Sequence, residues 1–160
     1  MGSIILIVSA IVFVAALLDA AWGDLRALRI PNRVPLTVLA AFVPAALSMG
    51  LSGEAWLVHL GTGVLSFVAA AVLFSLGVWG GGDAKLAPAV LLWVGPADLP
   101  RFLLVMALVG GLVALAALVA RRAEAGGLRP AMGGHVPYGI AIAAGGLDWA
   151  AASLLPRLAG

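Results

Sequence analysis

Long apolar runs make up most of the chain, and short polar or glycine- and proline-containing segments separate them. A run of about 20 apolar residues can cross ~30 Å of hydrocarbon as a helix that rises ~1.5 Å per residue. The connections carry turn and cap residues, among them Asn32 as the expected N-cap of the second helix, with Pro35 tolerated in its first turn. The pattern predicts six helices, near residues 3–23, 34–51, 55–79, 84–96, 100–120 and 137–155.

Composition identifies the solvent in which these helices pack. Hydrophobic residues make up 64% of the 160 residues, charged residues only 10%, and the mean hydropathy is +1.18, well outside the range of soluble domains. No polar stretch is long enough to form a separate soluble domain. We therefore predict an all-α fold, a polytopic membrane bundle of about six transmembrane helices, in which residues 1–160 form a single membrane-embedded domain.

The residue types present exclude several kinds of chemistry. The chain has no cysteine, which excludes disulfides, thiolate nucleophiles and thiolate metal sites. His59 and His135 stand 76 residues apart and make a poor metal site. His59 falls in an apolar helix, where a hydrogen-bonded packing role is expected. We predict no cofactor, no metal and no nucleic-acid partner.

Basic residues gather on alternate connections. Arg101 and Arg157 lie on one side of the predicted bundle, and the other seven of the nine basic residues fall on the opposite side. By the positive-inside rule, the side with seven faces the cytoplasm and both termini lie outside. The seven are Arg26, Arg29, Arg33, Lys85, Arg121, Arg122 and Arg129.

The seven acidic residues fall into two groups. Glu54, Asp98 and Glu124 sit in or beside predicted loops, where solvation accounts for them. The other four lie within or at the edge of apolar runs, where an ionised aspartate costs roughly 2.5 to 3.5 kcal/mol at mid-bilayer. Such a cost makes a functional role the first hypothesis for these four: Asp19, Asp24, Asp83 and Asp148.

Asp83 follows three glycines and precedes a short apolar run. That run of ~12 residues gives only ~18 Å of helix, too short to span from the surface, so the glycine loop should dip into the membrane. Asp83 is then expected as the N-cap of the fourth helix. The simpler alternative is a plain cap with Lys85 extending to the interface.

Asp24 ends the first helix on the same predicted side as Asp83, so the two carboxylates can meet. Asp19 lies five residues earlier, a rotation of ~140° and a rise of ~7.5 Å, and points to a different face. Asp148 lies nearer the outer end of the last helix, where it can bond within the bundle or pair with Arg101 or Arg157. Two carboxylates that share a proton can hydrolyse an amide without metal: one activates water and the other protonates the carbonyl oxygen.

Three segments resemble one family. "GGGDAKL" (80–86) resembles the G-x-G-D-x-K segment of type IV prepilin peptidases, and "DLRALRIPN" (24–32) resembles the segment with their other catalytic aspartate. "GHVPYGIAIAAGG" (134–146) is similar to the final helix of short Tad-type members, which process Flp pilins. The resemblance implies a bacterial inner-membrane aspartic endopeptidase that removes the leader of a prepilin at the cytoplasmic face.

The resemblance also assigns residues and partners. Asp24 and Asp83 match the catalytic pair, Gly80 and Gly82 shape the loop beside Asp83, and Lys85 fills the motif lysine. Pro31 and Asn32 complete the upstream segment. The implied partners are a prepilin of Flp type, the pilus assembly machinery and membrane lipids.

Longer relatives also carry an N-terminal region with paired cysteines that N-methylates the new pilin terminus. This sequence has neither, so we predict a peptidase without methyltransferase activity and without zinc. Two other function classes stay open. Intramembrane aspartates also mark the ion paths of small ion- or proton-coupled transporters. A non-catalytic pilus assembly subunit could keep both aspartates.

Overall fold

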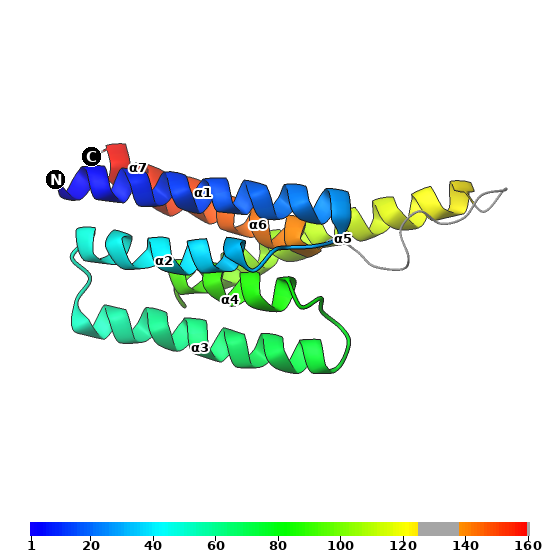
Figure 1. Cartoon of the computed structure of the whole chain (residues 1–160), viewed down its shortest axis with the longest axis horizontal. Coiled ribbons are helices and arrows are strands. Elements are labelled where there is room, and N and C mark those ends of the chain that lie inside the picture. The colour runs from blue at the N-terminus through cyan, green and yellow to red at the C-terminus, as the bar shows by residue number, and fades with distance from the viewer. Residues whose placement is uncertain (125–137, 160) are drawn as a thin grey trace.

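The computed structural model describes residues 1–124 and 138–159, and within these ranges every regular element is a helix (Figure 1). The last three elements follow one another without a break and form one span that contains a single π-helical turn. The prediction of six helices in an all-α bundle is therefore confirmed. Their bounds are α1 Gly2–Ala27, α2 Arg33–Ser48, α3 Gly53–Ser75, α4 Asp83–Val94, α5 Leu99–Glu124, and the sixth segment with α6 Tyr138–Trp149, η1 Ala150–Leu154 and α7 Leu155–Ala159.

Local chemistry explains where several helices begin and end. Ser52 caps α3, since its hydroxyl oxygen accepts a hydrogen bond of 3.2 Å from the N–H of Ala55. α1 ends at Leu28, which adopts the left-handed conformation (φ 49°) and donates its N–H to the carbonyl of Asp24. α4 ends at Gly95 with φ 68°, and a Cβ there would lie 2.9 Å from the His59 ring.

Two predictions about caps need correction. The N-cap of α4 is Gly82, and Asp83 is the first residue of the helix, one position later than predicted. Asn32 does occupy the N-cap position of α2, but its side chain makes no capping hydrogen bond. The Asn32 side chain instead makes a tertiary contact, described below, and the Asp83 carboxyl faces a pocket.

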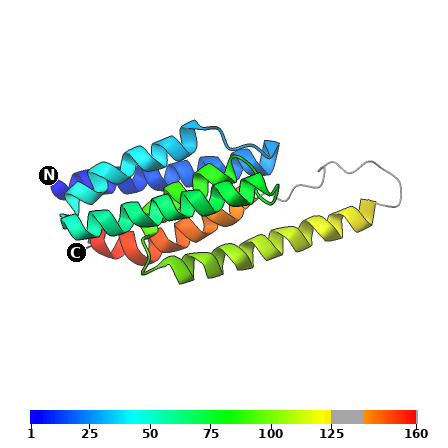
Figure 2. The same cartoon turned by 90° about the horizontal axis from the view of Figure 1, so that it is seen from below.

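The helices run antiparallel and place α4 at the centre (Figures 1 and 2). α1 packs against α2 and α6, while α4 packs against α2, α3 and α6; α5 contacts mainly α6. Both termini lie at one end of the bundle, and the α1–α2 and α3–α4 connections lie at the other (Figure 1). The two segments that carry the predicted motifs therefore meet at the same end.

An aromatic cluster fixes α4 within the bundle. Trp93 is buried, and its ring lies 4.5 Å from that of Phe13 on α1 and 5.8 Å from that of Phe42 on α2, between centroids. Its indole N–H donates a hydrogen bond of 2.9 Å to the carbonyl of Val38. Tilted and edge-to-face aromatic packing adds to the apolar burial. Trp149 completes the cluster from the sixth segment. The depth of α4, and so of Asp83 at its start, follows from these contacts.

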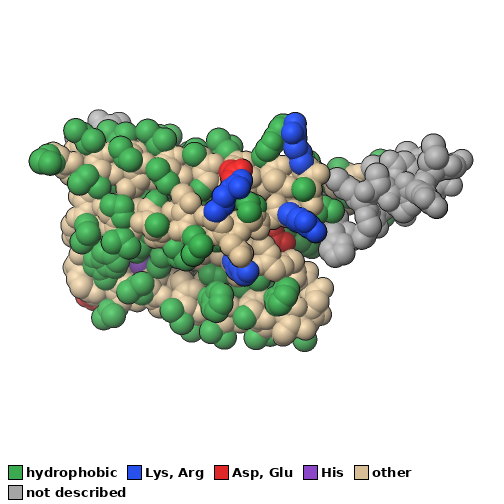
Figure 3. Space-filling view, in the orientation of Figure 1, with side chains coloured by type: hydrophobic (Ala, Val, Ile, Leu, Met, Phe, Trp, Pro, Cys, Tyr) green, Lys and Arg blue, Asp and Glu red, His purple; other side chains and the backbone are tan. Residues whose placement is uncertain are grey.

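The exterior suits a membrane. Within residues 1–124 and 138–159, four segments are long and apolar enough to cross a bilayer: Gly2–Ala27, Gly53–Ser75, Leu99–Val119 and Tyr138–Arg157. α2 and α4 are shorter; α4, with 12 residues, reaches only ~18 Å. Hydrophobic side chains cover much of the surface (Figure 3). The chain is a membrane protein, as its composition predicts.

Candidate active site

A pocket of about 620 Å³ opens between the α1–α2 connection and the glycine loop before α4. Six of the seven residues that the sequence assigns to the site line it, and the seventh, Lys85, binds one of the six. Residues 59 positions apart in the chain thus share one cavity. Its walls are Asp24, Leu28, Arg29, Ile30, Pro31, Asn32, Gly80, Gly81, Gly82 and Asp83.

Asp24 lies in the last turn of α1 and is only 5% exposed. Its Oδ2 accepts a hydrogen bond of 2.7 Å from the backbone N–H of Gly139. That amide belongs to the first turn of α6, where backbone N–H groups lack helical partners and the helix dipole favours a negative charge. The first turn of α6 therefore holds the carboxylate in place.

Asp83 faces the same pocket from the first residue of α4 and is 8% exposed. Its Oδ1 is buried and has no hydrogen-bond partner among the described residues. α4, with 12 residues, is shorter than the four segments that are long enough to cross a bilayer among the described residues. Burial raises the pKa of Asp83, and the charge of Asp24 raises it further, to about 7, although the backbone of Gly80 acts in the opposite direction. A proton can therefore stay on this carboxyl near neutral pH.

Two glycines leave space for the carboxylates, and a third leaves space for Ile30 on the opposite wall. A Cβ at Gly80 would lie 2.9 Å from Oδ2 of Asp83, and one at Gly139 would lie 2.8 Å from Oδ2 of Asp24. A Cβ at Gly82 would lie 2.9 Å from the Cβ of Ile30. These separations are too short for ordinary carbon contacts, so close approach requires glycine at each position.

Gly139 and Ile30 were not recognised from the sequence. Gly139 donates its N–H to Asp24, and its missing side chain leaves space for Ile30. The segment 134–146 that resembles the family's final helix contains this glycine, and that was the available signal. Ile30 had none, because an apolar residue in a loop gives no chemical clue.

Lys85 connects the two motif segments. Its ammonium donates a hydrogen bond of 2.9 Å to the side-chain oxygen of Asn32. The bond joins the first turn of α4 to the α1–α2 connection across 53 residues, and it explains why the Asn32 side chain does not cap α2. Lys85 and Asn32 thus hold together the two segments that carry Asp83 and Asp24.

The other intramembrane aspartates lie outside the pocket. Asp19 is exposed and pairs with Arg33 at 3.4 Å. Asp148 forms two hydrogen bonds with Arg101, of 2.7 and 3.0 Å. The prediction that Asp148 pairs with Arg101 or Arg157 is confirmed for Arg101.

Two further polar residues have structural roles. The prediction that solvation accounts for Asp98 is wrong: this half-buried carboxylate accepts hydrogen bonds from Trp149 (2.9 Å) and Ser153 (3.1 Å) and so joins the start of α5 to the sixth segment. The ring of His59 bonds to the carbonyl of Leu92 at 2.8 Å, which confirms its predicted packing role. Arg129 and His135 lie outside the described residues.

The arrangement fits proton transfer by carboxylates. Two buried carboxyl groups face one pocket; one accepts a backbone N–H, and the other has an oxygen without a hydrogen-bond partner among the described residues. Such a pair can keep one proton and act as base and acid together. Among the described residues, no group of three or more His, Asp or Glu side chains could hold a metal ion.

Comparison with known proteins identifies one family. The sequence model of the type IV leader peptidase family matches residues 11–115, which is more than half of the chain. The match contains Asp24, Asp83 and the glycine loop, and ends before the sixth segment. No curated protein and no solved structure matches the chain.

Proposed function

This chain belongs to the type IV leader peptidase family, and from that premise we propose that it is an aspartic endopeptidase that removes the leader of type IV prepilins, with Flp (Tad-type) prepilins as its substrates. One observation carries the proposal: Asp24 and Asp83, 59 residues apart, are both buried on a single pocket. Family membership implies a peptidase, and the two carboxylates supply a complete set of groups for amide hydrolysis without a metal.

The different surroundings of the two aspartates suggest their roles. Asp24, which accepts the Gly139 N–H, acts as the ionised base that takes a proton from the attacking water. Asp83, whose Oδ1 is free, holds the proton at rest and donates it to the carbonyl oxygen of the scissile amide. When the tetrahedral intermediate collapses, the C–N bond breaks and the proton taken by Asp24 passes to the leaving amine. A hydroxyl group of the intermediate returns its proton to Asp83 as the new carboxyl group forms.

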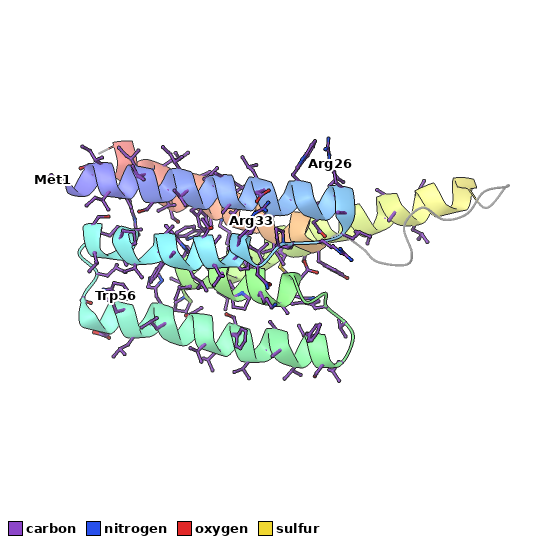
Figure 4. The ribbon with its side chains drawn as sticks, in the orientation of Figure 1. Met1, Arg26, Arg33 and Trp56 are labelled. Atoms are coloured by element: carbon purple, nitrogen blue, oxygen red, sulfur yellow. The ribbon has the colours of Figure 1, made fainter. Side chains whose placement is uncertain are left out.

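The location of the pocket suits a prepilin. A prepilin has a basic leader joined to an apolar helix, so its cleavage site lies where the chain enters the membrane. The pocket lies toward the end of the bundle where Figure 4 shows Arg26, and Lys85 binds Asn32 on the pocket wall. By the positive-inside rule we propose that this end faces the cytoplasm of a bacterial inner membrane and that both termini lie outside.

We propose peptidase activity alone for these 160 residues. The chain has no cysteine, whereas the methyltransferase region that the resemblance attributes to longer relatives carries paired cysteines. The proposed partners are the prepilin, the surrounding lipids and the pilus assembly machinery. The catalytic scheme uses carboxylates and water and assigns no step to a metal or cofactor.

The test is cleavage of a Flp-type prepilin by the purified protein in detergent or lipid, followed by mass spectrometry of the product. Asp24→Asn and Asp83→Asn should each lose leader removal, while Asp19→Asn and Asp148→Asn should keep it. The last two are matched controls because they change the same chemical group outside the pocket.

Other results would contradict the proposed catalytic pair or the proposed function. Loss of activity in Asp19→Asn instead of Asp24→Asn would shift the active residue by more than one helical turn and overturn the proposed pair. A folded wild type that cleaves no prepilin from the same genome would overturn the proposed function. Ion flux that Asp83→Asn abolishes would then support the transporter, and prepilin binding without cleavage would support an assembly subunit.

A further inference from the structure

A second cavity of about 520 Å³ opens beside the catalytic pocket, between α2, α3 and α4. α2 and α3 are consecutive, yet the backbone of α3 lies close to α4 and not to α2. The rings of Trp56 and His59 on α3 reach α2 at Phe42. The two helices stand apart with α4 behind them (Figure 1). We call this cavity, lined by these three helices, the lateral groove.

The walls of the lateral groove are apolar and helical in spacing. α2 contributes Leu36 and Leu39, and α3 contributes Leu60, Val64 and Phe67. The residues on α3 are spaced i, i+4 and i+7, which places them on one face over two turns, or ~10 Å. All five side chains are exposed in the free protein. They therefore offer apolar surface to a partner as long as two helical turns.

The floor of the groove is α4. Pro88, Ala89 and Leu92 line it, over about one turn of helix. On α3, Gly63 keeps the groove wall close to this floor, since a Cβ there would lie 3.1 Å from Cδ1 of Leu92. α4 is thus the base of the groove and also the helix that begins with Asp83.

The groove is continuous with the active site. Asn32 lines both cavities, and Lys85, which donates to Asn32, lines the groove at the same end. Only these two lining residues are polar or charged side chains, so the groove is polar where it meets the aspartates and apolar over the rest of its length.

We propose that the lateral groove binds the first two turns of the substrate's apolar helix, directly after the scissile bond. This inference rests on the proposed function and adds how the substrate is held. A leader joined to an apolar helix changes from polar to apolar at the cleavage site, and the joined cavities change in the same order. Binding the helix in the groove would place the junction at the carboxylates and reduce the freedom lost on reaching the transition state.

Filling the groove tests the proposal. Val64→Trp puts a large ring on the groove wall, whereas Leu65→Trp puts it on the next residue, which does not line the groove; the two positions are 62% and 73% exposed. We expect Val64→Trp to lower kcat/KM for a full-length Flp-type prepilin by about tenfold or more. It should leave unchanged the cleavage of a soluble peptide that contains the leader and junction but no apolar helix. Leu65→Trp should match the wild type with both substrates.

Cross-linking provides an independent readout with a smaller substitution. Because the chain has no cysteine, Val64→Cys and Leu65→Cys each carry a single thiol. In an Asp83→Asn background, which keeps the substrate uncut, Val64→Cys should form a disulfide with a prepilin that carries one cysteine within its first two helical turns. Val64→Cys should form no disulfide when the prepilin cysteine is moved four helical turns further along. Leu65→Cys should form no disulfide with either prepilin.

The outcomes separate the groove from the function. Suppose that the wild type cleaves the prepilin. If Val64→Trp cleaves it equally well, or if Val64→Trp lowers cleavage of the soluble peptide as much as cleavage of the prepilin, the groove assignment is wrong and the proposed function stands. Cross-linking at Leu65 as strong as at Val64 would also overturn the assignment, as would a groove occupied by a lipid acyl chain that the prepilin does not displace. A wild type that cleaves neither substrate would overturn the proposed function, and the groove assignment with it.

Discussion

Replacing Asp83 with Asn should stabilise the folded protein above neutral pH while it removes the proposed acid. The side chain is 8% exposed, and burial together with the charge of Asp24 raises its pKa from 3.8 to about 7. At about 1.36 kcal/mol for each pH unit, that rise corresponds to roughly 4 kcal/mol of lost stability when Asp83 is ionised. The pocket opens to solvent, which screens the charge. We therefore expect ionised Asp83 to lower the free energy of unfolding by about half that amount, ~2 kcal/mol.

The sign follows from where the proton binds more tightly. A carboxyl whose pKa is higher in the folded state than in the unfolded state favours folding when protonated. The wild type therefore loses stability as pH rises from about 4 to about 7, and the loss persists at higher pH. Asn carries no charge at any of these pH values and can still accept a hydrogen bond. The two proteins should differ least near pH 4 and most above pH 7.

The measurement is the unfolding temperature in detergent micelles between pH 4 and pH 8.5. At pH 8, Asp83→Asn should melt about 4 to 8 °C above the wild type. The control is Asp19→Asn, because Asp19 is exposed and paired with Arg33, so its neutralisation should give no gain that grows with pH. An Asp83→Asn protein that melts at or below the wild type at pH 8 would refute the reasoning from burial.

Three further predictions concern activity. Leader removal by the wild type should decline as pH rises through about 7, because Asp83 then loses the proton it must donate; a rate that is flat to pH 9 would argue against this role. Gly139→Ala should lower kcat/KM by about tenfold or more, since its Cβ would lie 2.8 Å from the carboxylate oxygen that its N–H binds, while Gly111→Ala, with open space around it, should be neutral. Lys85→Met should lower kcat/KM by roughly three- to tenfold, and adding Asn32→Ala should cost little more because one bond joins them; additive losses would show separate roles.

The helices could be predicted from the sequence, whereas several tertiary contacts could not. Helix existence follows from apolar runs, and the six segments were found with ends a few residues off. The fourth helix begins at Asp83 itself because Gly82 takes the cap position. Asp98 looked like a solvated loop residue because the indole N–H and hydroxyl that bind it lie 51 and 55 residues away. Such partners leave no mark in the local pattern.

The residues of the site could likewise be predicted from the sequence, but their contacts could not. Residue type and spacing selected Asp24, Asp83 and the glycines, because an aspartate is costly in an apolar run and a glycine triplet beside it serves close approach. The contacts among these residues were not available from the sequence. The Gly139 N–H that binds Asp24 lies 115 residues away, and the Lys85 bond to Asn32 spans 53.

The sequence alone determined that this is an all-α membrane protein with basic residues toward one end and two motif aspartates at matching depth. Hydrophobic runs, charge bias and motif spacing are local properties, and a bilayer converts them directly into helices and orientation. Only the tertiary structure decided that the two aspartates share a pocket, that Asp83 has the free oxygen, and that a lateral groove leads into the site. Those features depend on how α4 packs among α2, α3 and α6, and packing is set by side chains far apart in the chain.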